Sequence, residues 1–169
     1  MAKTETLNKK LLAAAISSSK PTEIREMVQD GADVNCTNKF GMTPLMLACQ
    51  YNSCIAVAKA LIESGADLYA KEPRYKSTPF HLAALSSSNP RIIETLLNAG
   101  ADIECRNYIG ETPLLMAING NPNAKLAVAL ITNGADVNAR DYQGNSALML
   151  AEKEKRKYLV KLLKEKGAN

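Results

Sequence analysis

The side chains with the most reactive chemistry in this 169-residue chain are one histidine and four cysteines: His81, Cys36, Cys49, Cys54 and Cys105. A catalytic histidine needs a nucleophile or an acid beside it, and a structural zinc site usually needs four Cys or His ligands at suitable spacing. No two cysteines form a C-x-x-C pair, and a single histidine cannot complete a metal set. We therefore predict no metal, no cofactor and no catalytic function. The cysteines are interpreted as reduced thiols of a cytoplasmic protein, because a chain of this length does not need disulfides.

Four aspartates could suggest acid–base chemistry, because they recur at nearly constant spacing: Asp33, Asp67, Asp102 and Asp136. One copy per structural repeat places neighbouring carboxylates roughly 10 Å apart, beyond the separation of catalytic carboxylate pairs. Their predicted role is to accept hydrogen bonds from backbone amides in turns.

The chain is poor in aromatic residues, yet four of its eight aromatics lie in short polar segments between apolar runs. These segments hold Lys39-Phe40, Arg74-Tyr75, Tyr108-Ile109 and Tyr142-Gln143, shortly preceded in three cases by Lys71, Arg106 and Arg140. Aromatic and Arg side chains dominate the energetics of protein interfaces. The alternative is that each ring packs against a neighbouring loop and the cations are merely solvated. We favour a binding surface, because aromatic rings in these polar segments would contribute little to a hydrophobic core.

The elements that position these residues follow from an internal repeat. The tripeptide Gly-Ala-Asp begins at Gly31, Gly65, Gly100 and Gly134, and Gly167-Ala168-Asn169 ends the chain, with spacings of 34, 35, 34 and 33 residues. A second marker runs in phase with it: Thr43-Pro44-Leu45, Thr78-Pro79-Phe80, Thr112-Pro113-Leu114 and Ser146-Ala147-Leu148.

Between the two markers the pattern predicts two helices. The first begins at the Thr, which can cap it, with Pro at the first helical position. The second carries an apolar stripe at i, i+1, i+4 and i+5, as in Val57, Ala58, Leu61 and Ile62, which is helical spacing. Its start is predicted from Asn89-Pro90 and Asn121-Pro122, each interpreted as a cap followed by Pro. The Gly of Gly-Ala-Asp then ends it.

These motifs resemble the ankyrin repeat. Residues 107–117 read N-Y-I-G-E-T-P-L-L-M-A and residues 134–139 read G-A-D-V-N-A, close to the family pattern. The resemblance implies an all-α solenoid of stacked helix pairs joined by hairpin-like fingers, and it makes His81 a structural residue that hydrogen-bonds Thr78 and backbone groups. One departure is the segment 71–77, which lacks the turn glycine and is expected to be irregular.

We expect a single domain over residues 1–169 with capped ends. Leu12, Ala15 and Ile24 are expected to supply the apolar face of the first cap. The predicted divisions are an N-terminal cap repeat at 1–37, repeats at 38–71, 72–106 and 107–140, and a C-terminal cap repeat at 141–169.

In the family that the sequence resembles, fingers and first helices form a concave surface that binds other proteins. The resemblance therefore implies an adaptor, scaffold or inhibitor. The mix of basic and aromatic residues on the fingers favours a partner protein with an acidic and partly apolar patch, and we expect a monomer with no small-molecule substrate and no membrane association. The neighbouring wall of the surface is predicted to be lined by Met42, Gln50, Tyr51, Leu85 and Glu111.

Two other classes of function stay open as alternatives. Basic residues interleaved with Tyr could stack on nucleic-acid bases, although the net charge of +4 is mild and spread along the chain. An enzyme is the other, but the sequence has no phosphate-binding loop and no evident nucleophile–base pair.

Overall fold

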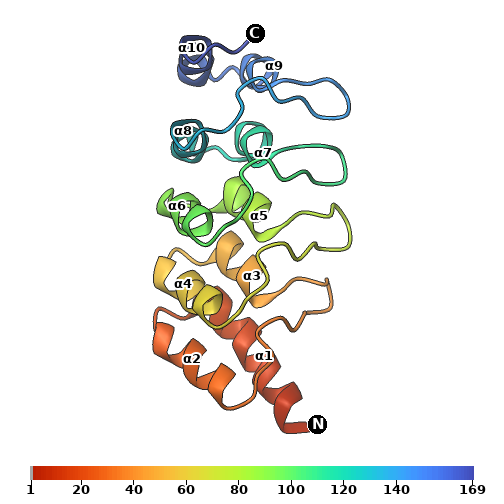
Figure 1. Ribbon diagram of the computed structural model, residues 1–169, viewed down its shortest axis with the longest axis vertical. Helices are drawn as coiled ribbons and strands as arrows, with labels where there is room; N and C mark the ends of the chain where they lie inside the picture. Colours follow the sequence, from red (N-terminus) through yellow and green to blue (C-terminus); the bar gives the residue numbers. More distant parts are fainter. Residues whose placement is uncertain (1) are drawn as a thin grey trace.

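Ten helices in residues 2–169, the part of the chain that the computed structural model describes, follow one another in five pairs (Figure 1). The inner helices, the first of each pair, are α1 (Ala2–Ser17), α3 (Pro44–Tyr51), α5 (Pro79–Ser86), α7 (Pro113–Gly120) and α9 (Ala147–Lys153). The outer helices are α2 (Pro21–Gln29), α4 (Ile55–Glu63), α6 (Arg91–Asn98), α8 (Ala124–Thr132) and α10 (Lys157–Glu165).

Inner helices stack on inner helices in the order α1, α3, α5, α7, α9, and outer helices stack on outer helices alongside them. The stack is therefore elongated, with its two ends far apart (Figure 1). Four loops project from the side of the inner helices that faces away from the outer helices (Figure 1). We call them finger 1 (38–42), finger 2 (72–77), finger 3 (107–111) and finger 4 (141–145). The predicted all-α solenoid with projecting fingers is confirmed.

The inner helices begin where the sequence predicts. The hydroxyl groups of Thr43, Thr112 and Ser146 each accept a hydrogen bond from the backbone N–H three residues further on, at 3.3, 3.4 and 3.3 Å. Pro44 and Pro113 occupy the first helical turn, where a missing N–H costs nothing. Each outer helix ends shortly before a glycine in the left-handed region, as at Gly31 with a φ of 103°.

The predicted cap at Asn121-Pro122 was wrong. Helix α8 begins later, and the side chain of Asn123 accepts the hydrogen bond from Lys125 N at 3.1 Å. Asn121 is buried instead, and its Nδ2 donates to the carbonyls of Ala84 and Ser87 in the preceding pair, at 3.1 and 3.4 Å. The helix end at α5 leaves carbonyls without partners, and this side chain satisfies them.

The core is a continuous layer of aliphatic side chains between the stacked helices. Phe80 is the only aromatic among the described residues to be buried in it. In the N-terminal cap, Ala15 and Ile24 are fully buried as predicted, but Leu11 rather than Leu12 provides the other fully buried face of α1. Leu12 packs at the edge of the core, one helical position away.

The repeat boundaries predicted after residues 37, 71, 106 and 140 all lie in loops between helix pairs. We retain them as our proposal for how the domain divides.

Candidate binding surface

Three of the fingers are held by one side-chain acceptor each. The Oδ1 atom of Asn38, Asn107 or Asp141 accepts two backbone N–H groups of its own finger, two and four residues further on, at 2.9 to 3.1 Å. A short polar side chain that binds nearby backbone in this way fixes a turn, and in finger 4 an isolated antiparallel β-bridge between Arg140 and Ser146 adds to it. The residues between acceptor and glycine are therefore presented at the tip of the finger.

Finger 2 is irregular, as predicted, and a buried carboxylate organises it. Glu72 stands where the other fingers have Asn or Asp, and the loop after it is one residue longer. Its longer side chain reaches three donors: Oε2 accepts from Arg74 N at 2.6 Å, and Oε1 accepts from the N–H groups of Tyr75 and Ser77 at 2.6 and 3.0 Å. Lys76 takes the left-handed conformation, with a φ of 56°, that glycine adopts in the other fingers.

Sequence reasoning missed this role of Glu72. The signal was available, because a longer acid replaces a shorter one where the loop gains a residue.

Neighbouring fingers are also joined to one another, but not evenly. The backbone N–H of Tyr108 donates to Tyr75 O at 2.7 Å, and that of Tyr142 donates to Ile109 O at 3.0 Å. The equivalent place in finger 2 is occupied by Pro73, which has no N–H to donate to finger 1. Fingers 1 and 2 are therefore joined by packing of the Pro73 ring over Gly41, where a β-carbon would lie 2.5 Å from that ring.

The four finger aromatics are all exposed, and the fingers that carry them project from the same side of the stack (Figure 1). Their exposed fractions are 65% for Phe40, 46% for Tyr75, 67% for Tyr108 and 72% for Tyr142. Lys39 lies over the Phe40 ring, 5.0 Å from its centroid, and Arg74 lies 4.8 Å from the centroid of Tyr75. Packing against a neighbouring finger, the alternative interpretation, is seen for Tyr142, whose ring covers Gly110, but it leaves most of that ring in solvent.

Two of the candidate binding arginines have a structural role that the sequence did not reveal. Arg106 Nη1 donates to Gly110 O and to Arg140 O, both at 2.7 Å, so that it links finger 3 to the segment before finger 4. Arg140 Nη1 likewise donates to Gly144 O at 2.9 Å. Lys71 and Gln143 are exposed, and Ile109 is half-buried.

A groove of about 430 Å³ lies between fingers 1 and 2 and the inner helices. Four of the five predicted wall residues line it: Met42, Gln50, Tyr51 and Leu85. The finger residues Phe40, Arg74 and Tyr75 border the same groove, together with Pro73, Leu82 and Met116, which sequence reasoning did not single out.

Glu111, the fifth residue predicted for the wall, is buried within finger 3. Its carboxylate accepts hydrogen bonds from Asn107 Nδ2 at 3.0 Å and from Asn119 Nδ2 at 3.3 Å. These hydrogen bonds hold the Glu111 side chain inside finger 3. Glu111 therefore supports the finger and does not face the groove.

His81 has the structural role that the resemblance implies. Its Nδ1 accepts a hydrogen bond from Thr78 N at 3.2 Å, and its Nε2 donates to Glu111 O at 3.0 Å. A backbone N–H can only donate and a carbonyl can only accept, so the ring is neutral with its proton on Nε2. Burial lowers the pKa of His81, although the Glu111 carbonyl opposes the shift.

All four cysteines carry free thiols. Burial raises the pKa of Cys36 to about 11, with the Asp33 carboxylate adding to the rise, and burial likewise raises the pKa of Cys105 to about 11. The pKa of fully buried Cys49 is raised further by the same cause. These three thiols are therefore protonated at neutral pH and poorly nucleophilic. Within residues 2–169, His, Cys, Asp and Glu side chains nowhere gather in a group of three that could hold a metal ion.

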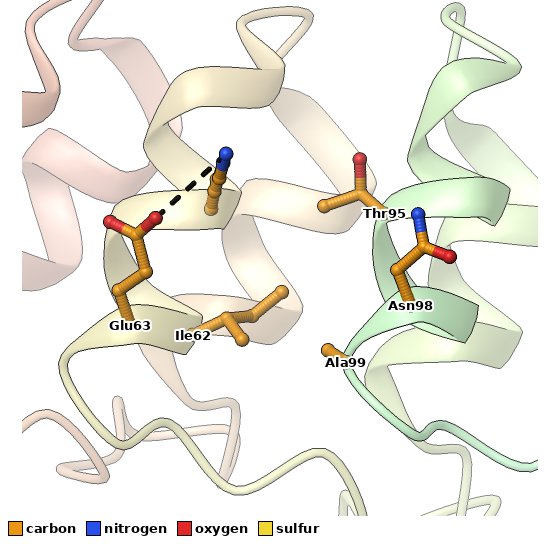
Figure 2. Close-up of a pocket in the computed structure, with 6 residues that line it drawn as sticks. Ile62, Glu63, Thr95, Asn98 and Ala99 are labelled. Carbon is orange, nitrogen blue, oxygen red and sulfur yellow. Dashed lines mark ion pairs between the residues drawn. The ribbon is translucent and has the colours of Figure 1, made fainter.

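The outer side of the stack has a different character. A hollow of about 310 Å³ separates α4 from α6 and is bordered by Ile62, Glu63, Thr95, Asn98 and Ala99 (Figure 2). The dashed line to Glu63 in Figure 2 is its ion pair with Lys59, 3.9 Å long and exposed to solvent. The hollow is bordered by no aromatic ring and by no unpaired cation, so it is a suitable control surface for tests of binding. No helix within the described residues is both long enough and apolar enough to cross a membrane.

Comparison with known proteins agrees with the fold. The family model for ankyrin repeats matches residues 11–107 and 80–169, so the chain belongs to the ankyrin-repeat family. It is similar to "Putative E3 ubiquitin-protein ligase XBAT35" of Arabidopsis thaliana, with 36% identity over 62% of this chain and 22% of that protein. It is also similar to BRCA1-associated RING domain protein 1 of Caenorhabditis elegans, with 35% identity over 60% of this chain and 14% of that protein.

A third similar protein is "Putative ankyrin repeat protein FPV024" of fowlpox virus, with 32% identity over 62% of this chain and 17% of that protein. The chain thus matches less than a quarter of the length of each of these relatives.

Proposed function

We propose that this chain is a protein-interaction module that binds a partner protein through the inner face, meaning the fingers together with the inner helices. Ankyrin repeats are in general modules of this kind. The observation that carries the proposal is the coincidence of exposed aromatic rings with an apolar groove on the same side of the stack. Exposed aromatic and apolar surface that is contiguous is typical of interaction sites.

The charges around the groove indicate the chemistry of the partner. Lys39, Lys71, Arg74 and Lys76 are exposed on or beside fingers 1 and 2, and none of them forms an ion pair with a described residue. The carboxylate within finger 2, that of Glu72, is buried and occupied by three backbone donors. The partner is therefore a protein with an acidic and partly apolar patch, for which this surface is complementary in charge.

The relatives' names refer to ligase and RING proteins, but this chain matches only a small part of their length. We propose that it contributes binding and no catalysis, acting as an adaptor, a scaffold or an inhibitor. We further propose that it is a monomer of the cytoplasm, where free thiols such as its four remain reduced.

Affinity capture from source lysate followed by mass spectrometry tests the proposal when three baits run in parallel. The baits are the unchanged chain, a Tyr75→Ala/Tyr108→Ala variant of the inner face, and a Thr95→Ala/Asn98→Ala variant of the outer hollow. Partners that bind the first and third baits but not the second are expected. Partners lost with the outer variant and retained by the finger variant would place binding on the opposite face.

A further inference from the structure

Two apolar hollows of the inner face lie in its N-terminal half, whereas Tyr108, Tyr142 and Met149 are exposed singly in the C-terminal half. The groove between fingers 1 and 2 continues into a second hollow of about 370 Å³ toward α1, bordered by Ile16 and Leu47. The two hollows share Phe40, Met42 and Tyr51 as their dividing wall. Together they form one channel that crosses α1, α3 and α5 and ends at α7.

The aromatic side chain at the Tyr51 position is lost in the C-terminal half. Gln50-Tyr51 in α3 corresponds to Asn119-Gly120 in α7 and to Lys153-Glu154 at the end of α9. Leu85, the apolar counterpart in α5, also belongs to the N-terminal half. The repeat therefore changes its inner side chains where the channel stops, although the backbone continues unchanged.

We propose that this channel binds an extended, acidic segment of the partner chain and takes up two of its apolar side chains, one in each hollow. The inference rests on the proposed function and narrows it to a class of ligand and to one half of the inner face.

That the bound segment is acidic is inferred from the cations that border the channel. Lys39 and Arg74 each lie over an exposed aromatic ring, so their charged groups are held at the rim beside the apolar floor. Lys76 follows in the same finger and is also exposed. A carboxylate beside an inserted apolar side chain can meet any of these cations, whereas a basic segment would be repelled.

That the bound segment is extended is inferred from the side chains at the floor of the channel. Gln50 lines the channel, and its Oε1 is turned away from solvent and accepts no hydrogen bond from any described residue, so a rotation of this side chain brings an unused acceptor to the ligand. A peptide helix uses its backbone N–H groups internally, while an extended segment carries free N–H groups along its length. The two hollows lie on successive repeats, about 8–10 Å apart as packed helices are. An extended segment in the polyproline II conformation rises about 3.1 Å per residue with three residues per turn, so side chains three residues apart share a face and lie about 9 Å apart.

The test is selection from a phage-displayed library of random twelve-residue linear peptides against the full chain. We expect enriched peptides to carry two large apolar residues about three positions apart and at least two Asp or Glu. A synthetic, fluorescein-labelled copy of an enriched peptide is then titrated with variants by fluorescence anisotropy. Tyr51→Ala and Arg74→Glu are expected to weaken its binding at least 10-fold.

The chain offers matched controls for both variants. Tyr158 on α10 is exposed to 62%, against 58% for Tyr51, and Arg91 on α6 is exposed like Arg74. Tyr158→Ala and Arg91→Glu are expected to change binding less than 2-fold. Gln50→Leu, which removes the enclosed acceptor, should weaken the peptide about 3- to 10-fold without lowering the melting temperature, so that loss of binding is separated from loss of folding.

The inference is overturned if no peptide is enriched, if the consensus is basic or helix-forming with apolar residues seven apart, or if the control variants weaken binding as much as the channel variants. The proposed function is tested separately, by the capture experiment. Partners captured from lysate that still require Tyr75 and Tyr108 would keep the inner face as the binding site while excluding the extended acidic ligand.

Discussion

Replacing Glu72 with Ala should loosen finger 2 and lower the stability of the whole stack. Three backbone N–H groups lose a charged acceptor at 2.6, 2.6 and 3.0 Å. Hydrogen bonds to a charged group contribute about 1.5–3 kcal/mol each when measured singly. Arg74 and Tyr75 are exposed, so their N–H groups can turn to water, whereas Ser77 is buried and its N–H cannot. We therefore expect a total loss of about 2–4 kcal/mol.

The assay is thermal and urea unfolding followed by circular dichroism. For a chain of this size, each kcal/mol corresponds to about 2–4 °C in melting temperature, so Glu72→Ala should lower it by roughly 4–16 °C. Glu72→Gln keeps one acceptor oxygen, so its melting temperature should lie between those of the parent chain and Glu72→Ala. Glu94→Ala, an exposed carboxylate on α6, is the control and should cost less than about 0.5 kcal/mol. Equal melting temperatures for Glu72→Ala and Glu94→Ala would refute the claim that this carboxylate holds the finger.

Four further predictions concern the stack itself. Leu96→Ala opens a cavity in the fully buried centre and should reduce the free energy of unfolding by about 2–5 kcal/mol; a urea titration in which it matches a surface Lys→Ala variant of α10 would contradict the packing. Asn121→Ala leaves two carbonyls of the preceding pair without a donor and should cost about 1–3 kcal/mol by the same titration. Gly110→Ala, at a φ of 81° and beneath the Tyr142 ring, should cost more than about 1 kcal/mol, and a stability equal to the parent would show that the two fingers do not pack as described. Because burial lowers the pKa of His81, the unfolded chain binds its proton first, so stability should be unaffected above about pH 6.5 and fall as the pH drops below it; His81→Gln should remove that part of the slope in unfolding curves measured from pH 7.5 to 5.

The repeat could be predicted from the sequence because its signals are local and redundant. Thr43-Pro44 caps and begins a helix by its own chemistry, and Gly31 ends one because it tolerates a positive φ. Each signal recurs in phase, so an error in one repeat is corrected by the others. The start of α8 was misplaced where this redundancy fails. The loop at Asn121 has more than one polar residue able to cap, and only the preceding pair decides which one does.

The site was harder to predict because its residues act across repeats. Exposure of Phe40 and Tyr108 follows from their place in a finger, and both rings are exposed. The cross-repeat contacts of Arg106 depend on the distance to the next finger, which one repeat alone does not reveal. Glu111 was misplaced for a similar reason, since its side chain turns toward Asn107 and Asn119 and away from the groove.

The central claim is that the inner face binds a partner protein, and amide hydrogen exchange of the complex tests it most directly. With a captured partner bound, exchange should slow at the backbone amides of fingers 1 to 3 and at the C-terminal ends of α3 and α5. The amides of α4, α6 and α8, on the outer side, should exchange as they do in the free chain. Protection confined to the outer helices, with the fingers unchanged, would contradict the account.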